Sequence, residues 1–285
     1  RDQTATTAWA RGARPDALVL CAAVVGGIED NRLRPAEYAR DNLLIHVNAI
    51  HAAVEAGATR LCVIGSSCMY PRDCPQPMRE EALWTGPLEP TNQAYAAAKL
   101  ASIETALAYG RQHGVDVCVP VAPNLYGPGD RYDRARGHFL AGMIEAFCDA
   151  TDLTGEPPTL WGTGTPCREA MPVTQFAQAA VALMLRYPNA GIVNIGLGRD
   201  RTIADWARLV AQASGWETSR ISGEEATPGR VIPRCHWDQS KPDGMPRKVL
   251  DSRKSWGLIG NWGANVDDVA EIQAACAEYR RLRGR

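Results

Sequence analysis

Tyr95 and Lys99 lie four residues apart in a stretch with helical periodicity, so their side chains project from one face. An ammonium beside a phenol favours the phenolate, so we expect a lowered pKa for Tyr95 and proton exchange near neutral pH. Ser66 ends an apolar run that precedes this helix. A strand-end hydroxyl and a Tyr-Lys pair can together bind a carbonyl oxygen from two sides while hydride arrives. The alternative is a solvated lysine beside a packed tyrosine.

Three short apolar runs predict the buried parallel strands that position these residues: 17–23, 60–67 and 115–122. Two helices are predicted between them: about 35–56, ended by Gly57, and about 91–113, ended by Gly114. Such alternation predicts a parallel sheet with helices on its faces, and ligands bind beyond the carboxyl ends of its strands. A returning strand is expected at 193–196, a helix from near Thr202, and a loop-rich stretch at 228–262.

The composition excludes several classes of protein. The chain has 31 basic and 32 acidic residues, a net charge of −1, and 45% apolar residues. This balance argues against a nucleic-acid binder, and the longest apolar run, 17–28, is too short to cross a bilayer. The nine cysteines lack the CxxC spacing of a zinc site, so we predict no metal. Cys21, Cys62 and Cys118 are expected to be small buried side chains, and a reducing cytoplasm fits the cysteine usage.

Ser66, Tyr95 and Lys99, in this order, resemble the catalytic set of the extended branch of the short-chain dehydrogenase/reductase superfamily. Further segments narrow the resemblance to the GDP-L-fucose synthase family: 22–28, 65–71, 76–78, 88–92, 95–99, 124–128, 161–166, 168–169, 240–244 and 246–248. The likeness runs over nearly the whole chain in the order of the family. The segments Gly-Ser-Ser-Cys-Met-Tyr-Pro at 65–71 and Lys-Pro-Asp-Gly at 241–244 are its most particular parts.

The resemblance implies NADPH-dependent 3,5-epimerisation and 4-reduction of GDP-4-keto-6-deoxy-D-mannose to GDP-L-fucose, or of a closely related 4-keto nucleotide sugar. Both epimerised carbons neighbour the ketone, which acidifies their protons, so a base and an acid must flank the sugar ring. By the resemblance, Ser66 and Tyr95 act on the C4 oxygen and Lys99 holds the nicotinamide ribose. Cys68 and His138 would then exchange the protons at C3 and C5. The alternatives are a buried thiol without a role and an ordinary surface imidazole.

The resemblance also implies binding residues. The implied substrate contacts are Asn124, Trp161, Arg168 and Lys241, and the implied contacts to NADP are Lys99, Ala22, Ala23, Ser66, Asn124 and Leu125. The planar fork of Arg168 suits a diphosphate, and the flat face of Trp161 suits a nucleotide pocket. A core role for Trp161 and a structural turn at Lys241 are the alternatives.

The implied fold is a Rossmann-like doubly wound parallel sheet with a smaller α/β substrate lobe. We expect the NADP-binding domain at 1–135 and 169–200 and the nucleotide-sugar lobe at 136–168 and 201–285. Helices around Leu43–Val54 and Tyr95–Ala108 are expected to pair across a two-fold axis, as in similar reductases, which predicts a homodimer.

The chain departs from the family at its start. Family members open with a strand, a GxxGxxG turn and a helix that bind the cofactor pyrophosphate, and this chain does not open with that unit. Two explanations stay open: a fragment of a complete enzyme, which Arg1 in place of Met favours, or a homologue that has lost its dinucleotide site. Either way, we expect the strand at 17–23 to have an exposed edge.

Smaller departures concern the substrate. Glu145 stands where the family usually carries basic residues, and we expect its carboxylate to weaken the grip on a diphosphate by repulsion. Val24 and the segment 173–175 also differ from the family pattern. Two alternative functions therefore stay open: a nucleotide-sugar 4-epimerase or 4-reductase without the 3,5-epimerase step, and a catalytically silent homologue that binds a sugar nucleotide.

Overall fold

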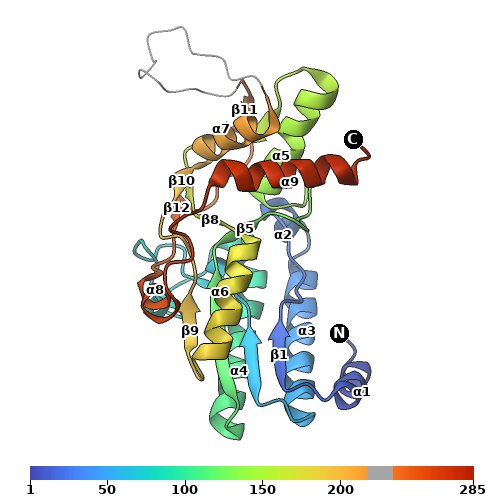
Figure 1. Cartoon of the computed structure of the whole chain (residues 1–285), viewed down its shortest axis with the longest axis vertical. Helices are drawn as coiled ribbons and strands as arrows, with labels where there is room; N and C mark the ends of the chain where they lie inside the picture. Colours follow the sequence, from blue (N-terminus) through green and yellow to red (C-terminus); the bar gives the residue numbers. More distant parts are fainter. Residues whose placement is uncertain (217–233) are drawn as a thin grey trace.

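The computed structural model of the chain describes residues 1–216 and 234–285. Its lower part in Figure 1 is a five-stranded parallel sheet with the order β1-β2-β4, and β3 and β9 also pair with β4. These strands are β1 (Ala17–Leu20), β2 (Arg60–Val63), β3 (Gly65–Ser66), β4 (Asp116–Ala122) and β9 (Gly191–Asn194). The predicted α/β fold with a parallel sheet is confirmed.

Helices cover both faces of the sheet (Figure 1). Those in this part are α1 (Gln3–Ala13), α3 (Pro35–Glu55), α4 (Gln93–His113), α6 (Val173–Arg186) and α8 (Arg253–Ile259). Leu61 and Val63 share a core with residues of α3 and α4, whereas Cys62 packs with residues of α6. Successive strand residues point to opposite faces, so one short strand serves both cores.

The two long helices end where the sequence predicts. Gly57 and Gly114 have φ values of +97° and +70°, in the left-handed region that favours glycine. One short helix and three 3-10 turns follow the strands: α2 (Ile28–Leu33), Ser67–Met69, Glu80–Ala82 and Pro90–Asn92.

The upper part in Figure 1 is a lobe built on α5 (Phe139–Asp149), α7 (Ile203–Ser214) and α9 (Asp268–Leu282). Phe147, Trp206 and Tyr279 are buried in its core. The hydroxyl of Thr202 accepts the Asp205 N–H at 3.0 Å, which caps α7 at the predicted place. A π-helical turn at Ala150–Thr154 follows α5.

Short strands complete this lobe and join it to the sheet part. They are β6 (Thr159–Trp161) with β11 (His236–Asp238), β7 (Cys167–Arg168) between β10 (Arg201–Thr202) and β12 (Arg247–Lys248), and β5 (Asn124–Tyr126) with β8 (Ala170–Pro172). The stretch predicted as loop-rich thus carries β11, β12 and α8, and its residues 228–233 lie outside the described residues. The buried cores cross the predicted domain boundaries: Leu250 and Ile259 pack into the cores of the sheet part, and Tyr126 and Ala170 into the core of the lobe. The boundaries stay a prediction.

Two expectations at the first strand need correction. β1 ends at Leu20 rather than at residue 23, and Cys21 is exposed rather than buried. Cys21 follows the last paired residue of a strand that pairs with β2 and forms one edge of the described sheet. Cys62 and Cys118 are buried as predicted. Among the described helices, none has the length and apolar character to span a membrane.

Candidate active site

A pocket of about 460 Å³ lies between the carboxyl ends of the sheet strands and the upper lobe. The predicted residues that line it are Ser66, Cys68, Tyr95, Lys99, His138, Asn124, Trp161, Arg168, Lys241, Ala23 and Leu125. The position agrees with the rule that ligands of open parallel sheets bind beyond the strand ends. Ala22 is the exception, because it is not among the lining residues and its carbonyl lies 2.9 Å from His46 Nε2.

One tight turn presents both a hydroxyl and a thiol to this pocket. Ser66 ends β3 and caps the 3-10 turn Ser67–Met69, because its Oγ accepts the Cys68 N–H at 3.2 Å. The turn therefore fixes Ser66 and Cys68 relative to each other before any ligand binds.

The structure reverses the predicted pKa shift of Tyr95. Burial raises the pKa of Tyr95 and the neighbouring Cys68 raises it further, whereas the Ser66 hydroxyl lowers it. The prediction of a lowered pKa is wrong because burial dominates, and Lys99 is not among the groups that lower the pKa of Tyr95. The Tyr95 phenol, which lines the pocket, therefore holds its proton at neutral pH.

Lys99 is almost fully buried, with 3% of its surface exposed. Its Nζ donates to the Ile64 carbonyl at 3.0 Å, and burial lowers the pKa of Lys99 to about 8. An ammonium has three donors, so its other N–H groups can serve ligands in the pocket that Lys99 lines. Hydroxyl groups of a ribose are suitable acceptors.

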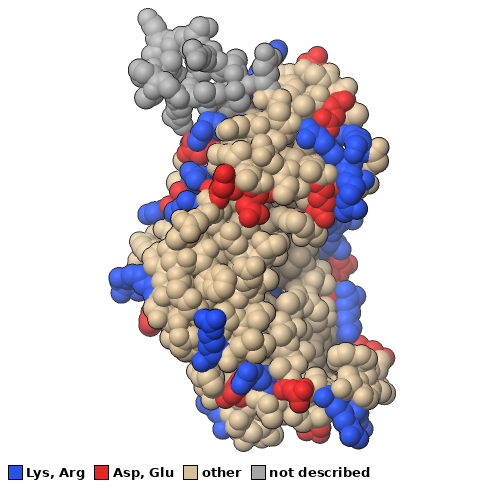
Figure 2. Space-filling view, in the orientation of Figure 1, with Lys and Arg blue, Asp and Glu red and all other residues tan. Residues whose placement is uncertain are grey.

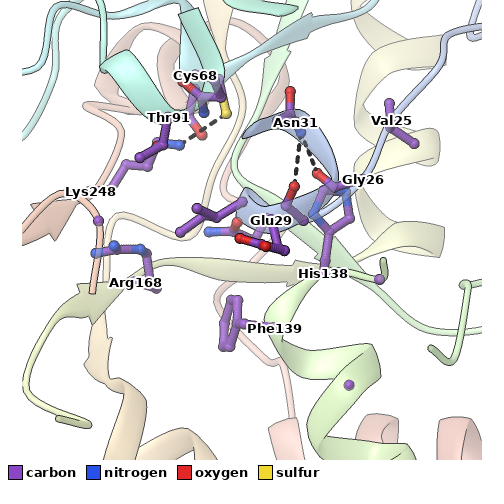
Figure 3. A pocket seen from close by; sticks show the side chains of 18 of the residues that line it. Val25, Gly26, Glu29, Asn31, Cys68, Thr91, His138, Phe139, Arg168 and Lys248 are labelled. Atoms are coloured by element: carbon purple, nitrogen blue, oxygen red, sulfur yellow. Dashed lines mark hydrogen bonds between the residues drawn. The ribbon is translucent and has the colours of Figure 1, made fainter. Parts of the chain in front are cut away.

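Cys68 has a partner that the sequence did not single out as a site residue. Lys248 Nζ lies 3.1 Å from Cys68 Sγ, as the dashed line in Figure 3 shows. Although burial raises the pKa of Cys68, Lys248, Ser66 and Arg168 lower it more, so the pKa lies below its ordinary value. Cys68 is thus disposed to act as a thiolate base.

His138 lies across the pocket from the Lys248 and Arg168 side chains (Figure 3). It directly precedes α5. Burial lowers the pKa of His138 and so does Lys248, whereas Asp130 raises it. The imidazolium form is accordingly a stronger acid than an ordinary histidine.

Backbone between β1 and α2 forms the wall beside His138. Asn31 Nδ2 donates to the carbonyls of Gly26 at 2.9 Å and Gly27 at 3.0 Å, as Figure 3 shows. Gly27 N donates to the Arg136 carbonyl at 2.9 Å. A Cβ on Gly26 would lie 2.3 Å from the Tyr38 hydroxyl, so only glycine allows this approach.

The far part of the pocket combines an aromatic face with cations. Lys241 Nζ lies 5.1 Å from the ring centroid of Trp161, which is 41% exposed. Arg168 Nη2 donates to the Asp243 carbonyl at 3.1 Å, and the Asp243 carboxylate accepts the Thr163 N–H at 2.8 Å. The exposed, flat ring of Trp161 suits a nucleobase, and the positive charges of Lys241 and Arg168 suit a diphosphate.

The expected repulsion by Glu145 is not supported by its position. Glu145 is not among the lining residues, because its carboxylate accepts the Arg134 N–H at 2.6 Å and pairs with Arg283 at 3.1 Å. Its neighbour Ala146 and Arg134 line the pocket instead. The Glu145 carboxylate is thus held by Arg134 and Arg283 rather than in the pocket.

Comparisons with known proteins identify the family of this chain. The model of the NAD dependent epimerase/dehydratase family matches residues 1–196. GDP-L-fucose synthase 1 from Arabidopsis thaliana is 42% identical over 241 residues, which cover 85% of this chain and 70% of that protein. This chain belongs to the GDP-L-fucose synthase family. The resemblance inferred from its motifs is thereby confirmed.

Other members extend the comparison within the GDP-L-fucose synthase family. The GDP-L-fucose synthase of Escherichia coli (strain K12) is 38% identical over 247 residues, which cover 84% of this chain and 72% of that protein. A crystal structure of a GDP-L-fucose synthetase from Naegleria fowleri bound to NADP has a TM-score of 0.82 at 20% identity, and the match covers 99% of this chain and 83% of that one. At that identity the likeness concerns the fold.

Proposed function

We propose that the chain catalyses NADPH-dependent 3,5-epimerisation and 4-reduction of GDP-4-keto-6-deoxy-D-mannose to GDP-L-fucose. The observation that carries the proposal is the 3.1 Å contact between Lys248 Nζ and Cys68 Sγ in the pocket that Ser66 and Tyr95 also line. A ketone reductase needs a proton donor at the carbonyl oxygen. An activated thiol beside that donor can carry out a second reaction, the removal of a proton from carbon.

In the reduction stage, Ser66 and Tyr95 bind the C4 oxygen. A reduced nicotinamide, when bound, would supply the hydride for C4. Because burial raises the pKa of Tyr95, the phenol carries a proton that it can give to the developing alkoxide. Lys99 holds the nicotinamide ribose with the donors that Ile64 leaves free.

The described residues fit the nicotinamide ribose half of the cofactor. The buried Lys99 ammonium supports this assignment, and Ala23, Asn124 and Leu125 line the adjoining wall. The GxxGxxG spacing at Gly257–Gly263 lies at the end of α8 and outside the pocket, so the assignment does not extend to the pyrophosphate. NADP rather than NAD rests on the solved relative that is bound to NADP.

In the epimerisation stage, the Cys68 thiolate removes a proton from the ring carbon beside the ketone. Charge then develops on the C4 oxygen, where the hydroxyls of Ser66 and Tyr95 stabilise it. His138, on the other side of the pocket, returns a proton to the opposite face of the carbon. Lys248 favours the anionic form of Cys68, because it lowers the pKa that burial raises.

The test separates the two stages. In Cys68→Ser, we expect exchange of the C3 and C5 protons with deuterium to fall by about a hundredfold or more, while reduction of an already epimerised ketone persists. In Tyr95→Phe, we expect the reduction rate to fall by at least as much, while exchange falls less, because the Ser66 hydroxyl still binds the C4 oxygen. Cys235→Ser, a partly buried thiol outside the pocket, is the matched control.

Other outcomes decide between the alternatives. Reduction without proton exchange in the parent protein would indicate a 4-reductase or 4-epimerase. Binding of the nucleotide sugar with neither reaction would indicate a catalytically silent homologue. Equal exchange rates in Cys68→Ser and the parent would remove the epimerase assignment.

We also propose a homodimer formed through α3 and α4. Leu43, Leu44 and Val47 on α3 are 36%, 40% and 41% exposed, which supports a partner on this face. The cytoplasmic location stays a prediction that the nine free cysteines support.

A further inference from the structure

Glu169 is a fully buried carboxylate, at 0% exposure, and is not among the residues that line the pocket. Its Oε1 accepts the Gly198 N–H at 2.7 Å, and its Oε2 accepts the Leu250 N–H at 2.8 Å. A Cβ on Gly196 would lie 2.5 Å from Oε1, so the main chain closes tightly around the carboxylate. Burying a carboxylate is unfavourable, and burial raises the pKa of Glu169 to about 7. The mechanism above gives this group no task.

The contacts of Glu169 converge on the strand that carries Lys248. Glu169 N donates to the Lys248 carbonyl at 3.1 Å, and Lys248 pairs with Arg168 in the parallel ladder of β12 and β7. Together with the bond from Leu250 N, one residue therefore holds the chain at Lys248 and two residues beyond it.

The same residue also reaches the substrate side of the pocket. Its carbonyl accepts Asn124 Nδ2 at 2.8 Å, and it directly follows Arg168 in the chain. Three pocket-lining residues, Lys248, Arg168 and Asn124, are thus tied to one buried position.

We propose that Glu169 is a positioning residue that sets Lys248 Nζ against Cys68 Sγ. The proposal rests on the proposed function, in which Cys68 acts as a thiolate. A long lysine side chain keeps a 3.1 Å contact only when its main chain is fixed, and the Coulomb energy of the pair changes steeply at such a distance. Each carboxylate oxygen of Glu169 accepts one main-chain N–H. A glutamine in its place has a single acceptor oxygen, because its other terminal group is an N–H donor.

The experiment measures Cys68 without substrate. The purified protein is alkylated with iodoacetamide across a pH series, and modification of Cys68 is followed by mass spectrometry of its peptide. The exposed Cys21 is the internal reference. We expect Lys248→Met to raise the pH midpoint of Cys68 alkylation by about 1 pH unit or more. Glu169→Gln should raise it by at least half as much.

A double variant tests whether the two residues act through one another. If Glu169 acts by placing Lys248, the midpoint of Glu169→Gln with Lys248→Met equals that of Lys248→Met alone. Glu278→Gln is the matched control, because Glu278 also accepts a main-chain N–H, that of Gly129 at 2.9 Å, but belongs to α9. Its midpoint should equal that of the parent.

Two results would overturn the proposal: a parental midpoint in Glu169→Gln, or shifts that add in the double variant. Circular dichroism first confirms that each variant is folded. If Glu169→Gln does not fold, Glu169→Asp takes its place, because it keeps the charge but is too short to meet both N–H groups. The readout is independent of turnover, so failure here is distinct from failure of the deuterium-exchange test.

Discussion

Burial governs the protonation states of Tyr95, proposed to bind the ketone oxygen, and of Lys99, proposed to hold the nicotinamide ribose. It raises the pKa of Tyr95 and lowers the pKa of Lys99 to about 8. At pH 7 the phenol is therefore protonated and the ammonium is still charged. This state is suited to giving a proton to an oxygen that gains negative charge, and it exists before the substrate arrives.

Lys99 also predicts a pH dependence of stability. Its pKa falls from 10.5 to about 8 on folding, so the unfolded chain binds more protons between these values, and stability rises with pH there. Between pH 7 and pH 10, Lys99 should add about 2 kcal/mol to the free energy of unfolding of the parent. The difference in the free energy of unfolding between Lys99→Met and the parent, measured by urea titration, should change by that amount between pH 7 and pH 10.

Lys254→Met is the control for this measurement. Lys254 Nζ also donates to a main-chain carbonyl, that of Ile192 at 2.6 Å, but Lys254 is exposed. A pH-dependent gap of the same size in this variant, or its absence in Lys99→Met, would contradict the role of burial.

Some site residues could be predicted from the sequence and others could not. Ser66 and Tyr95 are found from local pattern, because a strand end and a helix face are short-range features. The pairing of Cys68 with Lys248 spans 180 residues and depends on how β12 docks, which no local pattern specifies. The shift of Tyr95 was predicted in the wrong direction because burial is a property of the folded chain.

At the scale of elements, α3 holds the backbone that forms one wall of the pocket. Asn42 on α3 is fully buried, its Oδ1 accepts the Val24 N–H at 2.8 Å, and its Nδ2 donates to the Val24 carbonyl at 3.0 Å. One side chain thus satisfies both main-chain groups of a residue beside the pocket.

Asn42→Leu should therefore loosen this wall. It leaves the N–H and carbonyl of Val24 without their partner, which we expect to lower the free energy of unfolding by about 2 kcal/mol or more. Hydrogen exchange of peptides covering residues 20–33 should accelerate in the variant. Asn48→Leu removes another buried asparagine of α3, one that donates to the Arg1 carbonyl at 2.8 Å, and should leave that exchange unchanged. Equal exchange in both variants would refute the assignment.

The reliability of element predictions follows from how each element is stabilised. α3 and α4 were located because Gly57 and Gly114 end them and their apolar residues repeat along them. The short strands β7, β10 and β12 were not predicted, since two-residue strands have no periodicity of their own and form only where distant segments meet.

At the scale of the whole molecule, charges of both signs pair between the helices of the upper lobe. Arg280 pairs with Asp152 at 2.8 Å, and Arg283 and Arg285 reach Glu145 and Asp149 at 3.1 Å. Figure 2 shows basic and acidic groups gathered beside one another near the end of α9. This arrangement joins α9 to α5, whose residues Gly142 and Met143 line the pocket.

The proposed homodimer makes a prediction at the same scale. A charge at Val47, on the exposed apolar face of α3, should prevent two copies from burying that face. We expect Val47→Glu to sediment as a monomer at concentrations where the parent sediments as a dimer. Leu282→Glu places the same charge at a residue of α9 that is 58% exposed and should leave the assembly unchanged. A variant Val47→Glu with the mass of the parent would exclude this interface.

Ser66 and Cys68, joined through a single intervening residue and a shared hydrogen bond, have a consequence for protein engineering. A change in the backbone of that turn displaces the groups proposed for both chemical stages at once. Variants meant to perform only one stage are therefore better sought among side chains on separate elements, such as His138 and Lys99. The same linkage makes it unfavourable for natural variation to retune one stage by insertion or deletion within the turn.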